Sequence, residues 1–179
     1  MALVEDSQAF VLIADYAAAD TAGKLNIIGA GFQLVNAPGG VFPSPHTVLV
    51  VIDVPQKYAG DQCAVSIELR NETTGSPVKV PTGPAGKLDT LRVSQSVDIS
   101  APALGPGITV PRDVPCKIQI ALAMPPGLPL QPNSEFAWRL SIDGTHKKGW
   151  EARFWTLSGP TPPVFGGPSG PADIPNVQL

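Results

Sequence analysis

The sequence has few of the side chains that carry out catalysis or bind metals. Its 179 residues include only two histidines, His46 and His146, and two cysteines, Cys63 and Cys116. Neither histidine has a second histidine or a cysteine at the spacing of a metal site, and a nucleophilic triad needs a suitably placed histidine. The cysteines lie in apolar runs typical of buried free thiols, with a single disulfide as the less favoured alternative. We therefore expect a non-enzymatic protein with no catalytic residue, no metal and no cofactor.

Charge of either sign is also sparse. Twelve basic and fifteen acidic residues give a net charge of −3, and no basic stripe of the kind that binds nucleic acid is present. The densest basic cluster, His146–Lys148, is interpreted as a solvated hairpin tip. The apolar run at residues 9–19 contains Asp15 and is too short to cross a membrane, and the acidic start with Glu5 and Asp6 is unlike a signal peptide. We expect a cytoplasmic protein, or one assembled there into a larger particle, with neither nucleic acid nor membrane as a partner.

Residues that interrupt regular structure are abundant instead. The chain has 21 prolines and 18 glycines, yet 43% of its residues are hydrophobic. The many prolines and glycines argue against long helices, and the hydrophobic residues are numerous enough to form a core. We predict an all-β fold: a single antiparallel β-sandwich of about eight strands, Greek-key or jelly-roll-like, over residues 1–157.

Hydrophobic patterning and turn signals locate the strands. They are predicted at residues 8–17, 25–35, 47–54, 63–70, 88–99, 115–124, 135–142 and 150–157, with a short edge segment at 77–80. The first two should form an antiparallel hairpin, bent or bulged at Gly29–Gly31. The almost unbroken apolar run Thr47–Val54 indicates a strand in the centre of a sheet, whereas Cys63–Arg70 alternates as a half-buried strand does. Asp143–Gly144 predicts a tight turn between the last two strands.

The composition changes from Ser158 onward. Residues 158–179 contain six prolines, four glycines and one charged residue, Asp173. Such a segment has too little apolar material for a core, so we expect an extended tail that lies along a partner protein. The alternative is a tail that binds nothing. The apolar residues expected to anchor it are Val164, Phe165, Ile174, Val177 and Leu179.

Acidic residues and tryptophans offer two other interpretations. Asp15 and Asp53 could form a pair of carboxylates like that of a glycosidase, with Asp20 nearby, although aspartates beside turns more often bond to backbone amides.

The tryptophans, Trp138, Trp150 and Trp155, all fall in the predicted final hairpin. They could form a sugar-binding platform, but packing in the core is favoured.

The first hairpin carries a recognisable pattern. Phe10–Ala17, Asp20 and Gly23–Gly29 read "ADYA…D…GKLNIIG", and Leu128–Leu130 with Trp138–Gly144 supplies a Leu-Pro-Leu lead-in and a "WRLSIDG" arm. This chain therefore resembles an uncharacterised family of small β-sandwich proteins of bacteria and actinobacterial phages. The resemblance covers most of the predicted sandwich and implies that fold, but it implies no activity.

These observations favour a structural or interaction protein. We expect a phage virion component, such as a capsid decoration or minor capsid protein, bound to other virion subunits or to further copies of itself by its sheet surface and tail. Its location would then be the virion, after assembly in the host cytoplasm. The alternative is a cytosolic small-ligand or carbohydrate-binding β-sandwich module of a bacterial host. A hydrolase using the two aspartates ranks third.

Overall fold

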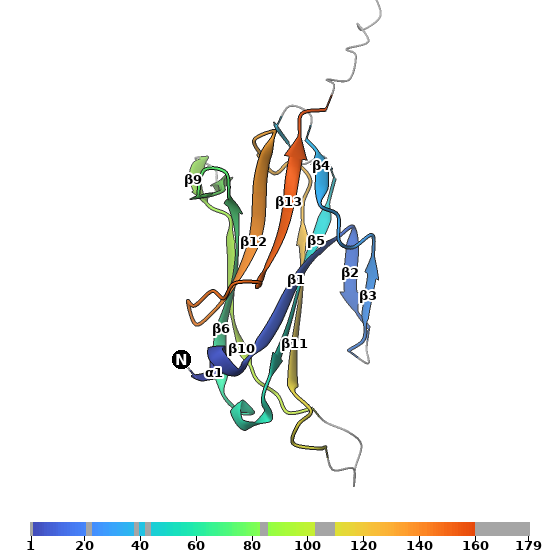
Figure 1. Ribbon diagram of the computed structural model, residues 1–179, viewed down its shortest axis with the longest axis vertical. Coiled ribbons are helices and arrows are strands. Elements are labelled where there is room, and N and C mark those ends of the chain that lie inside the picture. The colour runs from blue at the N-terminus through green and yellow to red at the C-terminus, as the bar shows by residue number, and fades with distance from the viewer. Residues whose placement is uncertain are drawn as a thin grey trace, which may run out of the picture.

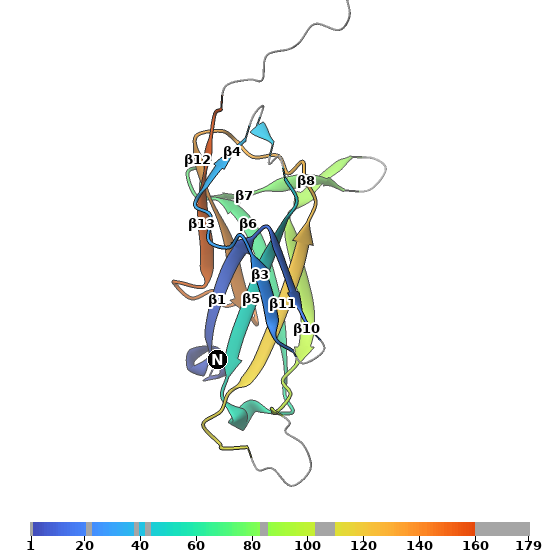
Figure 2. The ribbon, with the colours of Figure 1, turned by 90° about the vertical axis from the view of Figure 1, so that its right-hand side faces the viewer.

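A computed structural model describes residues 2–20, 23–37, 40–41, 44–82, 86–102 and 110–159. In this part of the chain two β-sheets pack face to face, as Figures 1 and 2 show from two sides. The first sheet has the order β1-β5-β11 and is antiparallel throughout. Its strands are β1 (Gln8–Ala14), β5 (His46–Val54) and β11 (Cys116–Met124). The predicted all-β, sandwich-like fold is confirmed.

The second sheet has the order β10-β6-β12-β13-β4. Its strands are β10 (Arg92–Asp98), β6 (Gln62–Asn71), β12 (Ser134–Ile142), β13 (Glu151–Leu157) and β4 (Leu34–Asn36), and the short β7 (Ser76–Pro77) also pairs with β6. Its pairs are antiparallel except that β4 runs parallel to β13, which departs from the wholly antiparallel expectation. The lone parallel pair arises because β4 reaches the sheet from the other side of the molecule, not through a tight hairpin.

Smaller elements extend from these sheets. Two hairpins are formed by β2 (Tyr16–Ala19) with β3 (Leu25–Ile28), and by β8 (Lys79–Thr82) with β9 (Lys87–Thr90). A five-residue helix, α1 (Ala2–Asp6), precedes β1, and a 3-10 turn, η2 (Gln56–Tyr58), follows β5. No helix in the described ranges has the length and apolar composition needed to cross a membrane.

The main core lies between the two sheets. Alternate residues of β6 point into it, as the sequence pattern predicted, and so do the large aromatic side chains of β12 and β13. These aromatic residues are Trp138, Phe136 and Phe154, and the two phenylalanine rings stack with their centroids 5.7 Å apart. Cys63 and Cys116 are free and buried in this core, and burial raises the pKa of both thiols.

A second, smaller core covers the central part of the outer face of the first sheet. The β2–β3 hairpin folds over this face, so that Ala17 packs on Leu49 and Val51 of β5, with Leu12 and Leu25 at the margin. The hairpin is visible as a separate layer beside the sheet in Figure 1. The central strand β5 is therefore buried on both faces, which explains its nearly continuous apolar sequence.

The first predicted hairpin differs from the observed one. Instead of one long pair over residues 8–17 and 25–35, only β2 and β3 pair with each other, while β1 pairs with β5 and β4 with β13. The chain changes direction at Asp15 and at Gly29, whose φ of 64° belongs to the left-handed region that glycine adopts easily. The predicted interruption at Gly29–Gly31 is thus present, and it separates two different strands.

The predicted strand at residues 88–99 is likewise divided. Leu91 accepts a hydrogen bond from Leu69 N of β6 and donates one to Val78 O, so its two backbone groups face different partners. The chain before it, β9, pairs with β8, and the chain after it, β10, pairs with β6.

The tight turn at Asp143–Gly144 is confirmed. Both residues have positive φ, and Ile142 and Thr145 exchange two backbone hydrogen bonds across the turn. Asp143 also bonds to Ala64 of β6 through its backbone N–H and its carboxylate. The turn therefore fixes the position of β12 against β6 as well as reversing the chain.

Candidate functional site on the outer face of the second sheet

The outer face of the second sheet carries a row of charged side chains across four strands. The strand register places Arg92 of β10 opposite Glu68 of β6, Glu68 opposite Arg139 of β12, and Arg139 opposite Glu151 of β13. The charge alternates along this row, so each side chain has neighbours of opposite sign. Opposite charges in directly facing positions stabilise a pair of strands. We call these four residues the charged row.

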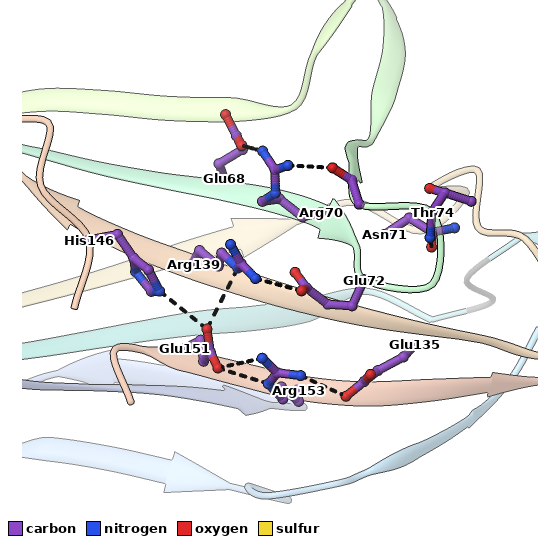
Figure 3. Close-up of polar contacts among 11 residues, drawn as sticks. Glu68, Arg70, Asn71, Glu72, Thr74, Glu135, Arg139, His146, Glu151 and Arg153 are labelled. Atoms are coloured by element: carbon purple, nitrogen blue, oxygen red, sulfur yellow. Dashed lines mark hydrogen bonds and ion pairs between the residues drawn. The ribbon is translucent and has the colours of Figure 1, made fainter. Parts of the chain in front are cut away.

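Ion pairs connect the row to charged residues beside it (Figure 3). Arg92 Nη2 lies 3.1 Å from Glu68 Oε2, and Arg139 Nε lies 3.6 Å from Glu151 Oε2. Arg139 also contacts Glu72 through Nη2, at 2.5 Å. Arg70, two residues after Glu68 on the same face of β6, bonds through Nη1 to Glu68 Oε1 at 2.9 Å. The network holds most of its side chains in fixed directions.

Arg153 extends the network along β13. Its guanidinium lies 2.8 Å from a carboxylate oxygen of Glu151 and 3.0 Å from one of Glu135. Figure 3 shows it between these two carboxylates. These hydrogen bonds raise the pKa of the Arg153 guanidinium, so it stays charged.

The carboxylates are only slightly exposed. The side chains of Glu72 and Glu151 are each 12% exposed. Burial by itself would raise the pKa of Glu151, but the hydrogen bond and charge of Arg153, with the charges of Arg139 and His146, outweigh it and hold that pKa below its ordinary value. Glu151 is therefore an ionised group held within the protein surface by its contacts with Arg153, Arg139 and His146.

The turn after β6 positions Glu72. The side-chain oxygen of Asn71 accepts a hydrogen bond from Thr74 N at 3.0 Å, and Thr73 Oγ1 accepts one from Glu135 N at 2.9 Å. The Glu72 backbone N–H donates to Glu135 O at 2.8 Å. The turn is thereby fastened to β12, and the carboxylate of Glu72 is directed at Arg139.

A shallow hollow of about 170 Å³ lies over the charged row. It is lined by Glu68, Arg70, Arg92, Arg139, Ser141 and His146. The ring of His146 borders it with Nδ1 2.8 Å from Leu140 O and Nε2 3.3 Å from Glu151 Oε2. The lining contains three arginines and one glutamate, and Arg70 and Arg92 share that glutamate, Glu68, so basic side chains predominate in the hollow.

An apolar patch adjoins the network at the β13–β4 edge. Trp155 is 46% exposed, Leu34 is 63% exposed and Leu157 is 44% exposed. Trp155 and Leu34 are paired in the parallel register of β13 and β4, and Leu157 lies two residues farther along the same face. We call these three residues the apolar patch. Large side chains gathered in this way on a sheet face are typical of a contact surface.

Of the three tryptophans considered from the sequence, only Trp155 is on the surface. Trp138 is fully buried and Trp150 is 4% exposed, so the favoured interpretation of core packing is confirmed for these two. The structure therefore does not form a platform of three indoles. A sugar-binding interpretation would rest on Trp155 alone.

The aspartates do not form a catalytic pair. Asp53 lies opposite Gln8 at the start of β1 and is bound to Lys117 Nζ at 2.6 Å, whereas Asp15 follows Ala14 at the other end of that strand. Seven residues of strand separate the two positions by about 23 Å. Asp20 Oδ1 accepts a hydrogen bond from Lys24 N, which confirms turn chemistry for this residue. Convergence of Asp15 and Asp53, on which the hydrolase hypothesis depended, is wrong.

The basic residues after β12 have a role that the sequence did not indicate. Lys147 Nζ contacts the backbone oxygens of Val4 and Glu5 at 3.1 Å each, and it lies 5.0 Å from the centre of the Trp150 ring. It therefore binds the carbonyl end of α1, where a cation is favourable, and the expectation of a solvated tip is wrong for this residue.

Two further predictions concern metal ligands and the tail. In the described ranges, no three histidine, cysteine, aspartate or glutamate residues gather as a metal site would require. The proposed tail anchors, Val164, Phe165, Ile174, Val177 and Leu179, lie outside the described residues.

Comparison with known families places the sandwich in one of them. The sequence model of DUF6941, a family of unknown function, matches residues 9–153. The chain belongs to this family. The DUF6941 match runs from β1 into β13 and includes the whole charged row, and it confirms the expectation of an uncharacterised family. No curated protein sequence matches the chain.

Proposed function

We propose that this protein is a structural protein that binds other protein subunits through the outer face of its second sheet. Most concretely, we propose a phage virion component, either a capsid decoration or a minor capsid protein, that is assembled in the host cytoplasm. The observation that carries this proposal is the apolar patch of Trp155, Leu34 and Leu157 beside a network of fixed charges.

The chemistry of this face suits a protein partner. Interface hot spots are rich in Trp and Arg, with the aromatic side chain at the centre and polar groups around it. Here Trp155 lies on the same face of β13 as Arg153, which is held by Glu135 and Glu151. Because the Arg153 side chain is already held by two carboxylates, little of its conformational entropy would be lost when a partner binds.

The tail begins beside this face. β13 ends at Leu157, and Ser158 N bonds to the side chain of Asn133 at 3.2 Å. A segment that leaves from there can contact the subunit that covers the apolar patch. Two linked contacts with one neighbour bind more tightly than either alone, so we propose that the tail adds its anchors to the same interface.

The test is to look for the protein in particles. The source strain is induced with mitomycin C, particles are banded on a density gradient, and the protein is followed by immunoblotting. Virion membership predicts that it bands with the major capsid protein. Finding it only in the soluble fraction above the particles would refute the virion assignment.

Variants then locate the contact. In a complemented deletion strain, Trp155→Ser should lower the amount of protein in the particles at least about tenfold, as expected for a hot-spot residue. The matched control is Phe10→Ser, because Phe10 is 45% exposed but lies on β1 of the other sheet. Removal of residues 160–179 should also lower incorporation. Equal loss with both serine variants would show that the apolar patch is not specific.

The exposure of Trp155 also favours a second candidate, a carbohydrate-binding module. A sugar stacked on this indole would change its fluorescence, while the buried Trp138 and Trp150 would respond little. Titration with a panel of bacterial oligosaccharides would show saturable quenching in the wild type and none in Trp155→Ser. Saturable binding, together with absence from particles, would favour this candidate over the virion assignment.

A further inference from the structure

The strand β10 forms one edge of the second sheet, and its far side is open. In the described part of the chain it pairs only with β6. The pairing covers seven consecutive residues without a bulge, and Ser94, Gln95 and Ser96 are all exposed. The strand contains no proline and no lysine, which are residues that commonly prevent an edge from pairing with another chain. In Figure 2, β10 lies at the margin of the second sheet.

The backbone groups on the open side can be assigned from the hydrogen bonds at the two ends of the strand. Leu69 N donates to Leu91 O at 3.1 Å, and Ile99 N donates to Asp61 O at 2.9 Å. In an antiparallel pair alternate residues bond to the same neighbour, so the odd-numbered residues between these two bond to β6. The even-numbered residues, Arg92, Ser94, Ser96 and Asp98, therefore direct their N–H and C=O groups to the open side.

The sequence of β10 is complementary to itself when it is reversed. It reads Arg-Val-Ser-Gln-Ser-Val-Asp. In an antiparallel pair of two such strands centred on Gln95, Arg92 of each strand faces Asp98 of the other, valine faces valine, and serine faces serine. This register also brings even-numbered residues opposite even-numbered residues, which the direction of the free backbone groups requires.

From this complementarity we propose that a second copy of this chain pairs with β10, about a two-fold axis through Gln95. The second sheets of the two copies then form one continuous sheet through an isologous contact. Two Arg92–Asp98 pairs and the hydrogen bonds of Ser94 and Ser96 define the register. This inference goes beyond the proposed function and holds whether or not the protein belongs to a virion.

Existing contacts orient both charges. Arg92 is held beside Glu68 in the charged row, and Asp98 accepts a hydrogen bond from Gln62 Nε2 at 3.0 Å. Another edge strand, β11, lacks this property, because a reversed copy would place Lys117, its one charged residue, opposite Ala123. Complementarity therefore distinguishes β10 from β11.

Apolar side chains beside the open edge add a reason for pairing. Val93 of β10 lines the cleft between the two sheets together with Ile120 and Leu122 of β11. All three are only partly buried, whereas residues deeper in the same core are fully buried. A second copy at this edge would cover them, and burial of apolar area favours association.

The experiment measures the mass of the full chain in solution by analytical ultracentrifugation over a range of concentrations. The wild type should form a dimer. Asp98→Arg places arginine opposite arginine twice and should weaken the dimer at least about tenfold. The double variant Arg92→Asp with Asp98→Arg restores opposite charges and should restore most of the affinity. Asp113→Arg, in an exposed loop, makes the same charge change elsewhere and should leave the dimer intact.

A second variant leaves the charges unchanged. Ser96→Pro removes an N–H that faces the open side but does not bond to β6, so the folded monomer should remain while the dimer is lost. Thermal unfolding followed by circular dichroism checks that each variant is folded. A wild type that stays monomeric at every concentration overturns the proposal. So does a dimer that persists in both Asp98→Arg and Ser96→Pro, or one that is lost in Trp155→Ser and not in Asp98→Arg.

Discussion

The outer faces of the two sheets differ in how far the rest of the chain covers them. The central part of the first sheet's outer face is covered by the chain's own β2–β3 hairpin, under which Leu49 and Val51 are almost completely buried. The second sheet leaves its outer face open and occupies it with paired charges and the apolar patch. Under the proposed function, the covered face contributes mainly to stability and the open face mainly to partner binding. Substitutions on the two faces should therefore have different consequences.

The largest effect is expected on the covered face. Leu49→Ala removes a fully buried side chain between β5 and the hairpin, and such truncations cost about 2–5 kcal/mol of unfolding free energy. Urea unfolding followed by tryptophan fluorescence measures it. Ser66→Ala, on the outer face of the neighbouring sheet's β6, is the matched control and should change the free energy by less than about 0.5 kcal/mol. Similar losses in both variants would contradict the division between the faces.

A smaller loss of unfolding free energy is expected from Arg139→Met. The change keeps much of the side-chain length but leaves Glu72 and Glu151, both only slightly exposed, without their shared cation. Glu151 keeps its contact with Arg153, but Glu72 loses the cation that pairs with it, and leaving such a partly buried charge unpaired costs about 1–3 kcal/mol. The measurement is again urea unfolding, with Arg112→Met in an exposed loop as the control.

Adding Glu72→Gln to Arg139→Met should recover part of the lost unfolding free energy, because it removes the charge left unpaired at Glu72. No loss in Arg139→Met would show that the charged row is solvated and not preorganised.

The difference between the two faces could be predicted from the sequence only in part. The almost unbroken apolar run of β5 indicated correctly a strand in the centre of a sheet, and the alternation of β6 indicated correctly a half-buried strand. Burial of β5 on both faces was not predicted. The covering hairpin was not separated from β1, because the direction changes at Asp15 and Gly29 are set by tertiary contacts. Local patterning reports the burial of a strand but not the identity of the segment that buries it.

The candidate site was harder to predict than the fold. Arg92, Glu68, Arg139 and Glu151 are far apart in the sequence, and only the strand register aligns them. Register follows from turns and core packing throughout the sheet, so no local motif contains it. Trp155 was named from the sequence, but its exposure depends on facing outward from β13 beside a short edge strand. One indication of the charged face was available from the sequence: the alternation in β6 placed Glu68 and Arg70 on the solvent side of that strand.

Acid should destabilise the core between the sheets and the open face of the second sheet in different pH ranges, because His46 faces that core beside Trp138 of β12. His46, buried at the start of β5, has its pKa lowered by burial, against a smaller opposing contribution from a backbone hydrogen bond at Ser44. The folded state therefore binds a proton less readily than the unfolded state, whose ordinary pKa is 6.5. The contribution of neutral His46 to the stability of the folded state is complete above pH 6.5 and is lost as the pH falls below this value. The pKa of Glu151 is also lowered, from 4.5, so its contribution is lost only below about pH 4.5.

Thermal unfolding measured from pH 7 to pH 3 separates the two contributions. His46→Phe should flatten the decline that begins near pH 6.5, while Glu151→Gln should flatten the decline below about pH 4.5 and leave the upper one unchanged. If Glu151→Gln altered only the upper range, the ionised network on the open face would not contribute to stability as proposed.

The smallest effect on folding should come from the residue with the largest proposed effect on binding. Trp155 is about half exposed and contributes little to the core, so Trp155→Ser should change the unfolding free energy by less than about 1 kcal/mol. The same variant should lose incorporation into particles, since an exposed indole beside fixed charges is valuable only when a partner covers it. Leu49→Ala, assayed at a temperature where it remains folded, should show the reverse: large destabilisation with normal incorporation. A Trp155→Ser protein that unfolds as readily as Leu49→Ala would show that the apolar patch serves the fold itself, and the two faces would then differ in composition but not in role.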